Sequence, residues 1–181
     1  MSLHAELVRH AASPACAVAG IGVDVAQGAD GWLRLRYRVT GDIRALRLAA
    51  PHAPQRADGL WQHSCFETFL RAAGASAYFE FHFAPSGAWA GYRFAARRDG
   101  RTDCAMPAPQ ILAHQHANGF LLEAAFDRSS IAELATAELE AGISAVIEDA
   151  QGALSYWALA HAGSAPDFHD PAGFRMRLPA R

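Results

Sequence analysis

The stretch SCFETFLRAAGASAYFEFHF, residues 64–83, decides the fold because both of its halves alternate with a period of two. Phe79, Phe81 and Phe83 share one face of the second half, and Phe66, Thr68 and Leu70 share one face of the first. This period of two is typical of β-strands with one buried face. A loop over residues 73–76 joins the halves into a hairpin, and only one register keeps the apolar residues on one face. The predicted cross-strand pairs are Leu70–Phe79, Phe69–Glu80, Thr68–Phe81, Glu67–His82 and Phe66–Phe83.

A third strand follows the turn APSG, in which Pro85 and Gly87 occupy positions that β-turns accept. If all four turn residues form the loop, Phe83 pairs with Ala88, and the polar face of the hairpin extends across the third strand. Opposite side chains lie about 5 Å apart at Cβ. The residues predicted on this face are Glu67, Glu80, His82, Trp89 and Arg93, with Trp61 at the rim. Cys65, Phe69 and Trp89 are poor choices for open solvent, so we expect another group to cover the face.

Short alternating segments continue on both sides, and turn sequences such as RRDG and DAQG separate many of them. One helix is predicted near residues 130–137, where Ser130 and Glu133 form a capping box. Many short strands with little helix favour a sandwich or a barrel. The expected strands are Ile21–Val25, Leu33–Val39, Ala45–Leu48, Ser64–Arg71, Ala77–Phe83, Ala88–Phe94, Phe120–Phe126, Ile143–Glu148, Leu154–Leu159 and Phe174–Leu178.

The composition favours a single globular domain over residues 1–181, with about half of the residues apolar and a formal net charge of −2. This charge argues against a nucleic-acid binder, which needs a basic surface. The sequence lacks a membrane-length apolar run and a secretory signal pattern. Three cysteines without a CxxC pattern suit reduced thiols. We therefore expect a cytoplasmic protein with no membrane partner; whether it forms a homodimer is left open by the sequence.

The face supplies the groups of a site for a small polar ligand: an aromatic plate for the C–H face of a sugar, and carboxylates for its hydroxyls. A metal at His63, Cys65 and Glu67 is disfavoured because side chains two residues apart on one strand lie nearly 7 Å apart. Ser64 faces away from His63, so that pair does not form a nucleophile and its base. A catalytic carboxylate pair, Glu67 with Glu80, stays open as an alternative.

Two further segments carry polar groups that strand alternation alone does not explain. Arg34, Arg36 and Arg38 alternate with apolar residues and indicate an exposed sheet face more than an anion site. The turn-rich segment PDFHDP, residues 166–171, offers Asp167 and His169, which either cap strands or reach a site.

The motifs LWQHSCFETFL, YFEFHFAPSGAWAGYRF and SAVIEDAQGALSYWALAH, with PDFH after them, resemble the DOMON-like proteins related to family 9 carbohydrate-binding modules. The resemblance covers nearly the whole chain. It implies an antiparallel two-sheet β-sandwich, jelly-roll or immunoglobulin-like, with a ligand site on a sheet face. It also implies sugar binding, or haem or flavin binding in other branches. His82 stands where the relatives are expected to carry asparagine.

The leading hypothesis is a non-enzymatic module that binds a carbohydrate or sugar derivative without a cofactor or a metal. Its predicted ligand-binding residues are Trp61, Glu67, Glu80, His82, Trp89 and Arg93. The alternative is a haem- or other cofactor-binding electron-transfer domain. Its axial ligands would be drawn from His82, His114, His116 and Met106. A face covered by another subunit remains a further possibility.

Overall fold

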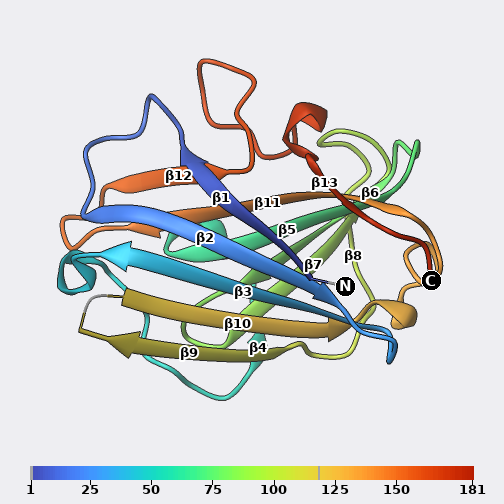
Figure 1. Ribbon diagram of the computed structural model, residues 1–181, viewed down its shortest axis with the longest axis horizontal. Helices are drawn as coiled ribbons and strands as arrows, with labels where there is room; N and C mark the ends of the chain where they lie inside the picture. The colour runs from blue at the N-terminus through green and yellow to red at the C-terminus, as the bar shows by residue number, and fades with distance from the viewer. Residues whose placement is uncertain (1, 118) are drawn as a thin grey trace.

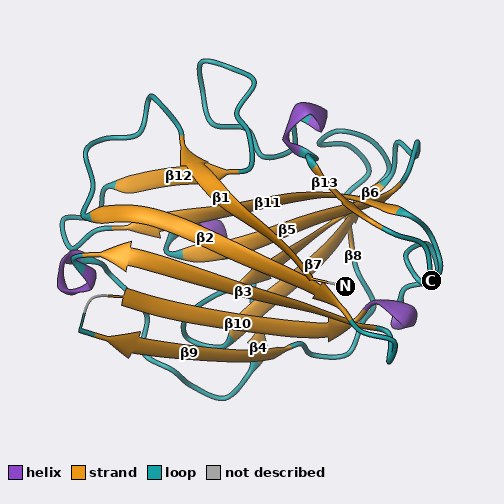
Figure 2. Cartoon of the chain, viewed as in Figure 1, coloured by secondary structure: helices purple, strands orange, loops and turns teal. Residues whose placement is uncertain are grey.

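The computed structural model describes residues 2–117 and 119–181, and these form an all-β fold, as predicted (Figures 1 and 2). The helical segments are single 3-10 turns: η1 (Ile43–Ala45), η2 (Leu60–Gln62), η3 (Arg128–Ser130) and η4 (Pro171–Gly173). None of the helices in the described residues is long and apolar enough to cross a membrane. The strands are β1 (Ser2–Arg9), β2 (Val18–Gln27), β3 (Trp32–Gly41), β4 (Gln55–Arg56), β5 (Cys65–Ala72), β6 (Tyr78–Phe83), β7 (Ala88–Phe94), β8 (Thr102–Asp103), β9 (Gln110–His116), β10 (Gly119–Asp127), β11 (Leu139–Glu148), β12 (Leu154–Ala158) and β13 (Met176–Leu178).

The strands form one continuous hydrogen-bonded path, in the order β4-β7-β6-β5-β11-β12-β1-β2-β3-β10-β9. Strand β1 links its two halves, because Ser2 to Leu7 pair with β2 while Val8 and Arg9 pair with β12. Neighbours are antiparallel except β4 and β7, which run parallel. β13 pairs with β11, and β8 pairs with β7, beside this path. A division into two separate sheets is therefore not confirmed; the structure shows a single sheet that curls over.

The two halves of the curled sheet enclose the main core. Phe81 of β6 and Phe126 of β10 pack with ring centroids 4.6 Å apart, and Phe66 stacks on Phe120 at 5.9 Å. The hydroxyl of Tyr37, from β3, crosses the core and donates to the carbonyl of Glu67 at 2.9 Å. These contacts fix the inner face of β5 and β6, so Glu67 and its alternating neighbours point outward, away from the core.

The predicted register of the first hairpin is confirmed. β5 and β6 pair at all five of the expected positions, including Glu67 with His82 and Phe69 with Glu80. The outward face of this hairpin therefore carries the polar residues that the sequence placed there.

The predicted register of the next hairpin is wrong by one residue. Phe83 pairs with Trp89 and not with Ala88. The Ala84 N–H donates to the Ala88 carbonyl at 2.9 Å, so the loop has three residues instead of four. Gly87, at φ 91°, closes this loop in the left-handed conformation that three-residue hairpins require. The shift exchanges the two faces of β7, and Trp89 and Arg93 leave the face of Glu67 and His82.

The predicted helix near residues 130–137 is also wrong. Asp127 caps the single turn η3 by accepting from the Ser129 N–H at 2.8 Å, and irregular turns follow up to β11. The buried guanidinium of Arg128 donates to the carbonyls of Leu134 at 2.8 Å and Ala137 at 2.7 Å. The segment therefore wraps around this side chain, a long-range arrangement that the local capping signal does not reveal.

Candidate functional site

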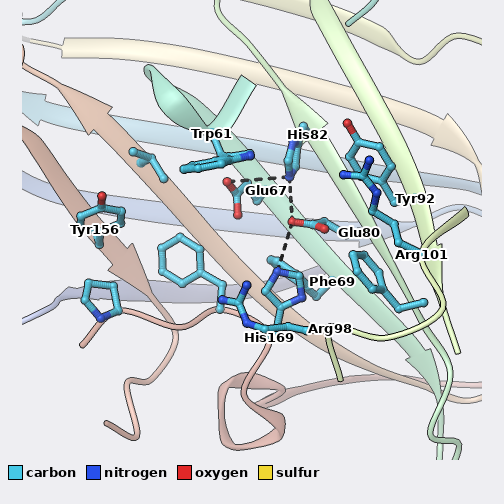
Figure 3. Close-up of a pocket in the computed structure, with 14 residues that line it drawn as sticks. Trp61, Glu67, Phe69, Glu80, His82, Tyr92, Arg98, Arg101, Tyr156 and His169 are labelled. Atoms are coloured by element: carbon cyan, nitrogen blue, oxygen red, sulfur yellow. Dashed lines mark hydrogen bonds and ion pairs between the residues drawn. The ribbon is translucent and has the colours of Figure 1, made fainter. Parts of the chain in front are cut away.

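A cavity of about 530 Å³ lies on the outward face of β5, β6 and β7 (Figure 3). Strands β11 and β12 contribute Val146 and Tyr156, and the segment around Phe168 closes another side. The chain itself thus supplies part of the cover that the apolar residues on this face require. The lining residues are Trp61, Glu67, Phe69, Glu80, His82, Tyr92, Phe94, Arg98, Arg101, Val146, Tyr156, Pro166, Phe168 and His169.

The floor of the cavity is polar, and strand pairing builds it. Glu67 and His82 are direct partners across β5 and β6, and Glu80 lies two residues from His82 on the same face. The Nε2 atom of His82 is 2.8 Å from Oε1 of Glu80 and 3.9 Å from Oε1 of Glu67. Figure 3 shows the two carboxyl groups turned toward this imidazole. We call Glu67, Glu80 and His82 the floor cluster.

Burial changes the ionisation of the floor cluster. Loss of hydration raises the pKa of Glu67 to about 7; the charge of Glu80 adds to this rise, and His82 opposes it. Burial also lowers the pKa of His82, but the attraction of Glu67 and the hydrogen bond with Glu80 outweigh this effect and raise it overall. The cluster therefore holds a proton more strongly than the same groups would in water.

The floor cluster does not satisfy its own hydrogen-bonding capacity. Within the described part of the chain, the Glu67 carboxylate accepts one hydrogen bond, from the Ser144 hydroxyl at 3.4 Å, which is long for such a bond. The buried Nδ1 atom of His82 has no hydrogen-bond partner among the described residues. Such unpaired groups are rare in protein interiors and indicate a place for a water molecule or a ligand.

His169 extends the polar floor from a loop that the sequence analysis had singled out without assigning a role. Its Nε2 atom lies 3.9 Å from Oε1 of Glu80, and its Nδ1 atom is 2.7 Å from the Tyr78 hydroxyl. The Arg98 backbone N–H donates to the same hydroxyl at 3.1 Å. Burial lowers the pKa of His169, which favours the neutral imidazole at neutral pH. The structure thus brings the segment Pro166–Pro171 to the site.

Ion pairs hold this loop in place. Asp167 accepts from Arg97 at 2.6 Å and from Arg98 at 2.8 Å, and it also accepts the backbone N–H of His169 at 3.1 Å. Asp170 lies 3.0 Å from Arg97. Arg98 has a φ of 57°, a conformation that few residues other than glycine adopt. The turn that carries Arg98 and the loop that carries His169 are therefore coupled at the rim of the cavity.

Aromatic side chains form the walls. Tyr92 presents its ring to the cavity, donates its hydroxyl to Asp58 at 2.6 Å, and carries the Arg101 guanidinium 4.8 Å from its ring centroid. Phe94 stacks on Tyr78 with centroids 4.9 Å apart. Trp61 is half exposed at the rim. A ligand in the cavity would therefore meet apolar plates at its sides and charged groups at its base.

The structure brings together four of the six predicted site residues: Trp61, Glu67, Glu80 and His82 all line the cavity. The other two lie on the opposite face of β7 as a result of the register shift. Arg93 there forms an ion pair with Glu133 at 2.7 Å, and Trp89 is buried beside Phe83. Tyr92 occupies the position on the cavity face that the prediction gave to an aromatic residue of the third strand.

The floor cluster is a group of described residues that could hold a metal ion, since one ligand atom from each lies within 4.8 Å of the others. The trio His63, Cys65 and Glu67, considered above as metal ligands, does not converge on one point. His63 pairs instead with Glu148 at 2.8 Å, and Cys65 is buried with its thiol pKa raised well above the usual value by loss of hydration. Only Glu67 of that trio lines the cavity.

The candidate haem ligands are spread over the molecule. His82 lines the cavity, whereas His114 and His116 are exposed on β9. The sulfur of Met106 lies against Gly91, which pairs with Phe81 on the core side of β6 and β7. These residues do not form an axial pair in this structure.

No protein-family model and no curated protein matches the sequence. The fold is similar to that of a Bacteroides uniformis protein described as a "putative carbohydrate-binding protein", with a TM-score of 0.69 and 15% identity over 96% of this chain and 84% of that chain. A family 9 carbohydrate-binding module from Caldicellulosiruptor kristjanssonii, solved with cellotriose, gives a TM-score of 0.47 and 12% identity over 81% of this chain and 68% of that chain. The first likeness extends over nearly the whole chain and concerns the fold.

Proposed function

We propose that the cavity binds a small polar ligand of the carbohydrate class and that the protein acts as a non-catalytic binding domain. The observation that carries the proposal is the buried floor of two carboxyl groups and an imidazole beneath aromatic walls. The two halves of the curled sheet would then correspond to the sandwich of DOMON-like domains related to family 9 carbohydrate-binding modules.

The chemistry of the cavity suits a sugar. A pyranose ring presents C–H groups on its faces and hydroxyl groups around its edge, so it needs flat apolar walls and clustered hydrogen-bond acceptors. Tyr92 and Phe94 supply such walls, and Glu67 and Glu80 supply acceptors. The volume of about 530 Å³ falls in the range of small-molecule sites.

The fold likeness supports the proposal without identifying a ligand. The Bacteroides uniformis protein, which is described as carbohydrate-binding, shares the fold across 96% of this chain. Because identity is 15%, the choice of sugar rests on the side chains of this cavity and not on the likeness.

Calorimetric titration with monosaccharides, disaccharides and their phosphorylated and acidic derivatives tests the proposal. Tyr92→Ala and Glu80→Gln are expected to weaken binding of the responding sugar at least tenfold, because each removes one wall or one acceptor. Glu133→Gln, an exposed carboxylate on the other face, is the matched control and is expected to bind as the wild type does.

Two outcomes would contradict the proposal. One is the absence of binding by any sugar in the panel. The other is turnover of a bound sugar that Glu67→Gln abolishes, which would make Glu67 and Glu80 a catalytic pair and the protein an enzyme.

A further inference from the structure

We propose that Glu67, Glu80 and His82, together with His169, form a binding site for a divalent transition-metal ion of the zinc class on the floor of the cavity. The inference stands on the mutual distances of Glu67, Glu80 and His82, with His169 as a further donor 3.9 Å from Glu80. It does not depend on whether a sugar binds above them.

The donor atoms select the class of metal. Two carboxylates and two imidazoles combine hard oxygen with borderline nitrogen ligands, a set that Zn²⁺ and its first-row neighbours accept. Calcium and magnesium favour sites built from oxygen alone. The two histidines therefore point to zinc, cobalt or nickel before calcium.

The distances are close to those of a metal site. Ligand atoms bonded to one zinc ion at 2.0–2.2 Å lie about 3–3.5 Å from each other. Nε2 of His82 lies 2.8 Å from Oε1 of Glu80 and 3.9 Å from Oε1 of Glu67, and all three donors fall within 4.8 Å of one another. Side-chain shifts of about 1 Å or less would bring these donors around one ion, because β5 and β6 already hold their backbones at the right separation.

The electrostatic balance of the floor also favours a cation. Glu67, Glu80 and His82 are each at least nine-tenths buried. In the described part of the chain, neither carboxyl group contacts an arginine: Arg98 is engaged with Asp167, and Arg101 lies over Tyr92. Two buried carboxylates beside one imidazole are costly. A dication with two neutral imidazoles would make the set neutral.

Neighbouring groups hold the proposed ligand side chains in position, as they do in known metal sites. The Tyr78 hydroxyl engages Nδ1 of His169 at 2.7 Å, which leaves Nε2 directed at Glu80. Hydrogen bonding to the second ring nitrogen is how proteins orient a ligating histidine. The Nδ1 atom of His82 has no hydrogen-bond partner among the described residues, which leaves it free to bond a water molecule while Nε2 faces the carboxylates.

The test uses the full-length protein after treatment with a chelator. Titration with Zn²⁺ is expected to show one site with micromolar or tighter affinity, and Co²⁺ is expected to give the visible absorption of a site with nitrogen ligands. Ca²⁺ is expected to bind at least tenfold more weakly than Zn²⁺. Glu80→Gln and His82→Asn are each expected to lower Zn²⁺ affinity at least a hundredfold.

Glu148→Gln is the matched control. Glu148 is buried and lies 2.8 Å from His63, the same distance that separates Glu80 from His82, but this pair has no third metal-ligating side chain beside it among the described residues. The control variant is expected to keep Zn²⁺ affinity within threefold of the wild type. Glu67→Gln provides a near-isosteric second variant if His82→Asn fails to fold, as judged by circular dichroism.

The proposal is overturned if the wild type does not bind Zn²⁺, if Ca²⁺ binds more tightly, or if Glu80→Gln binds Zn²⁺ as well as the wild type. Sugar titrations with and without Zn²⁺ separate this inference from the proposed function. Sugar binding by a protein that does not bind Zn²⁺ would contradict the metal-site proposal alone. Zn²⁺ binding without any sugar binding would contradict the proposed carbohydrate function alone.

Discussion

Glu67 carries an ionisable group at a place where only 2% of the residue is exposed. Tertiary structure, not local sequence, creates this environment: strands on both sides, the cover from the loop that carries Phe168, and the neighbouring carboxyl of Glu80 together exclude water. The carboxyl group is therefore retained at a cost to stability, which is typical of a group kept for binding.

This cost predicts a pH-dependent effect of Glu67→Gln in the chelator-treated protein. The pKa of Glu67 is raised from 4.5 to about 7, so the folded state binds the proton more tightly and wild-type stability falls as pH rises between these values. The raised pKa of His82 acts in the same direction: its contribution is present below its unfolded pKa and is lost as pH rises through the folded one.

At about pH 8, Glu67→Gln is expected to raise the free energy of unfolding by on the order of 1–3 kcal/mol, and at about pH 4.5 the variant and wild type are expected to converge. Urea unfolding at both pH values measures the difference. The control Glu148→Gln is expected to be destabilised at about pH 8, because Glu148 has close partners in Arg47 and His63, each at 2.8 Å. A destabilised Glu67→Gln at this pH would contradict the prediction.

At the residue scale, much of the polar floor was predictable from sequence. One register of β5 and β6 keeps the three alternating phenylalanines of β6 opposite Phe66, Thr68 and Leu70, and this register sets Glu67 opposite His82 with Glu80 beside them. The sequence marked His169 only as a loop residue, because its approach to Glu80 depends on contacts between distant parts of the chain. Tyr78 contacts His169 itself, and Arg97 and Arg98 anchor its neighbour Asp167. Local pattern carries no information on such contacts.

At the element scale, one glycine controls the aromatic wall. Gly87, at φ 91°, permits the three-residue loop that puts Tyr92 and Phe94 on the cavity face. A loop of four residues would turn Trp89 and Arg93 toward the floor instead. The length of this turn could not be predicted from the sequence, because APSG is compatible with both a three-residue and a four-residue loop.

Gly87→Ala is expected to lower the free energy of unfolding by about 1–2 kcal/mol, because the left-handed conformation strains any residue with a Cβ. An added Cβ would also lie 3.1 Å from the His52 carbonyl oxygen. Thermal or chemical unfolding measures the change. Gly163→Ala, where the nearest atom lies 3.5 Å from the added Cβ, is the control and is expected to stay within about 0.5 kcal/mol. Equal effects of the two substitutions would contradict the prediction.

Four strands escaped detection in the sequence, the long β1 and β9 and the two-residue β4 and β8, and one expected strand did not form. β1 and β9 each expose much of their length, and Leu7 is the single buried residue in the two strands. The segment Ala45–Leu48 makes only an isolated bridge, between Leu46 and Asp149, after the turn η1. Strand prediction from periodicity thus succeeds where one face is strongly buried and fails where most of the strand is exposed.

At the scale of the whole molecule, the all-β class was predictable from period-two alternation, but the continuity of the sheet was not. It depends on the pairing of Val8 with Ala158, residues at opposite ends of the chain. Neither segment carries a turn or a pattern that specifies this partner, so the information lies in how the two halves close over the core. A prediction of separate sheets is the natural result of reading segments one at a time.

The shared core predicts cooperative unfolding. Trp32 lies in β3 and Trp157 lies in β12, so tryptophan fluorescence reports on both halves of the sheet. Because core contacts such as Phe81 with Phe126 join the halves, unfolding is expected to be a single transition. The urea midpoints from fluorescence and from far-UV circular dichroism are expected to coincide. Two resolved transitions would show that the halves unfold separately.

The cavity combines a floor of paired strands with a side formed by a loop. This difference determines which residues can change ligand specificity. The cavity floor belongs to strands whose other face is locked in the core, whereas one side is a loop held by Asp167 and Asp170 against Arg97 and Arg98. Substitutions and small insertions in residues 161–166, ahead of Asp167 and His169, can reshape the entrance without disturbing strand pairing. Evolution, or an engineer, can therefore retune ligand choice through this loop while the buried floor keeps its chemistry.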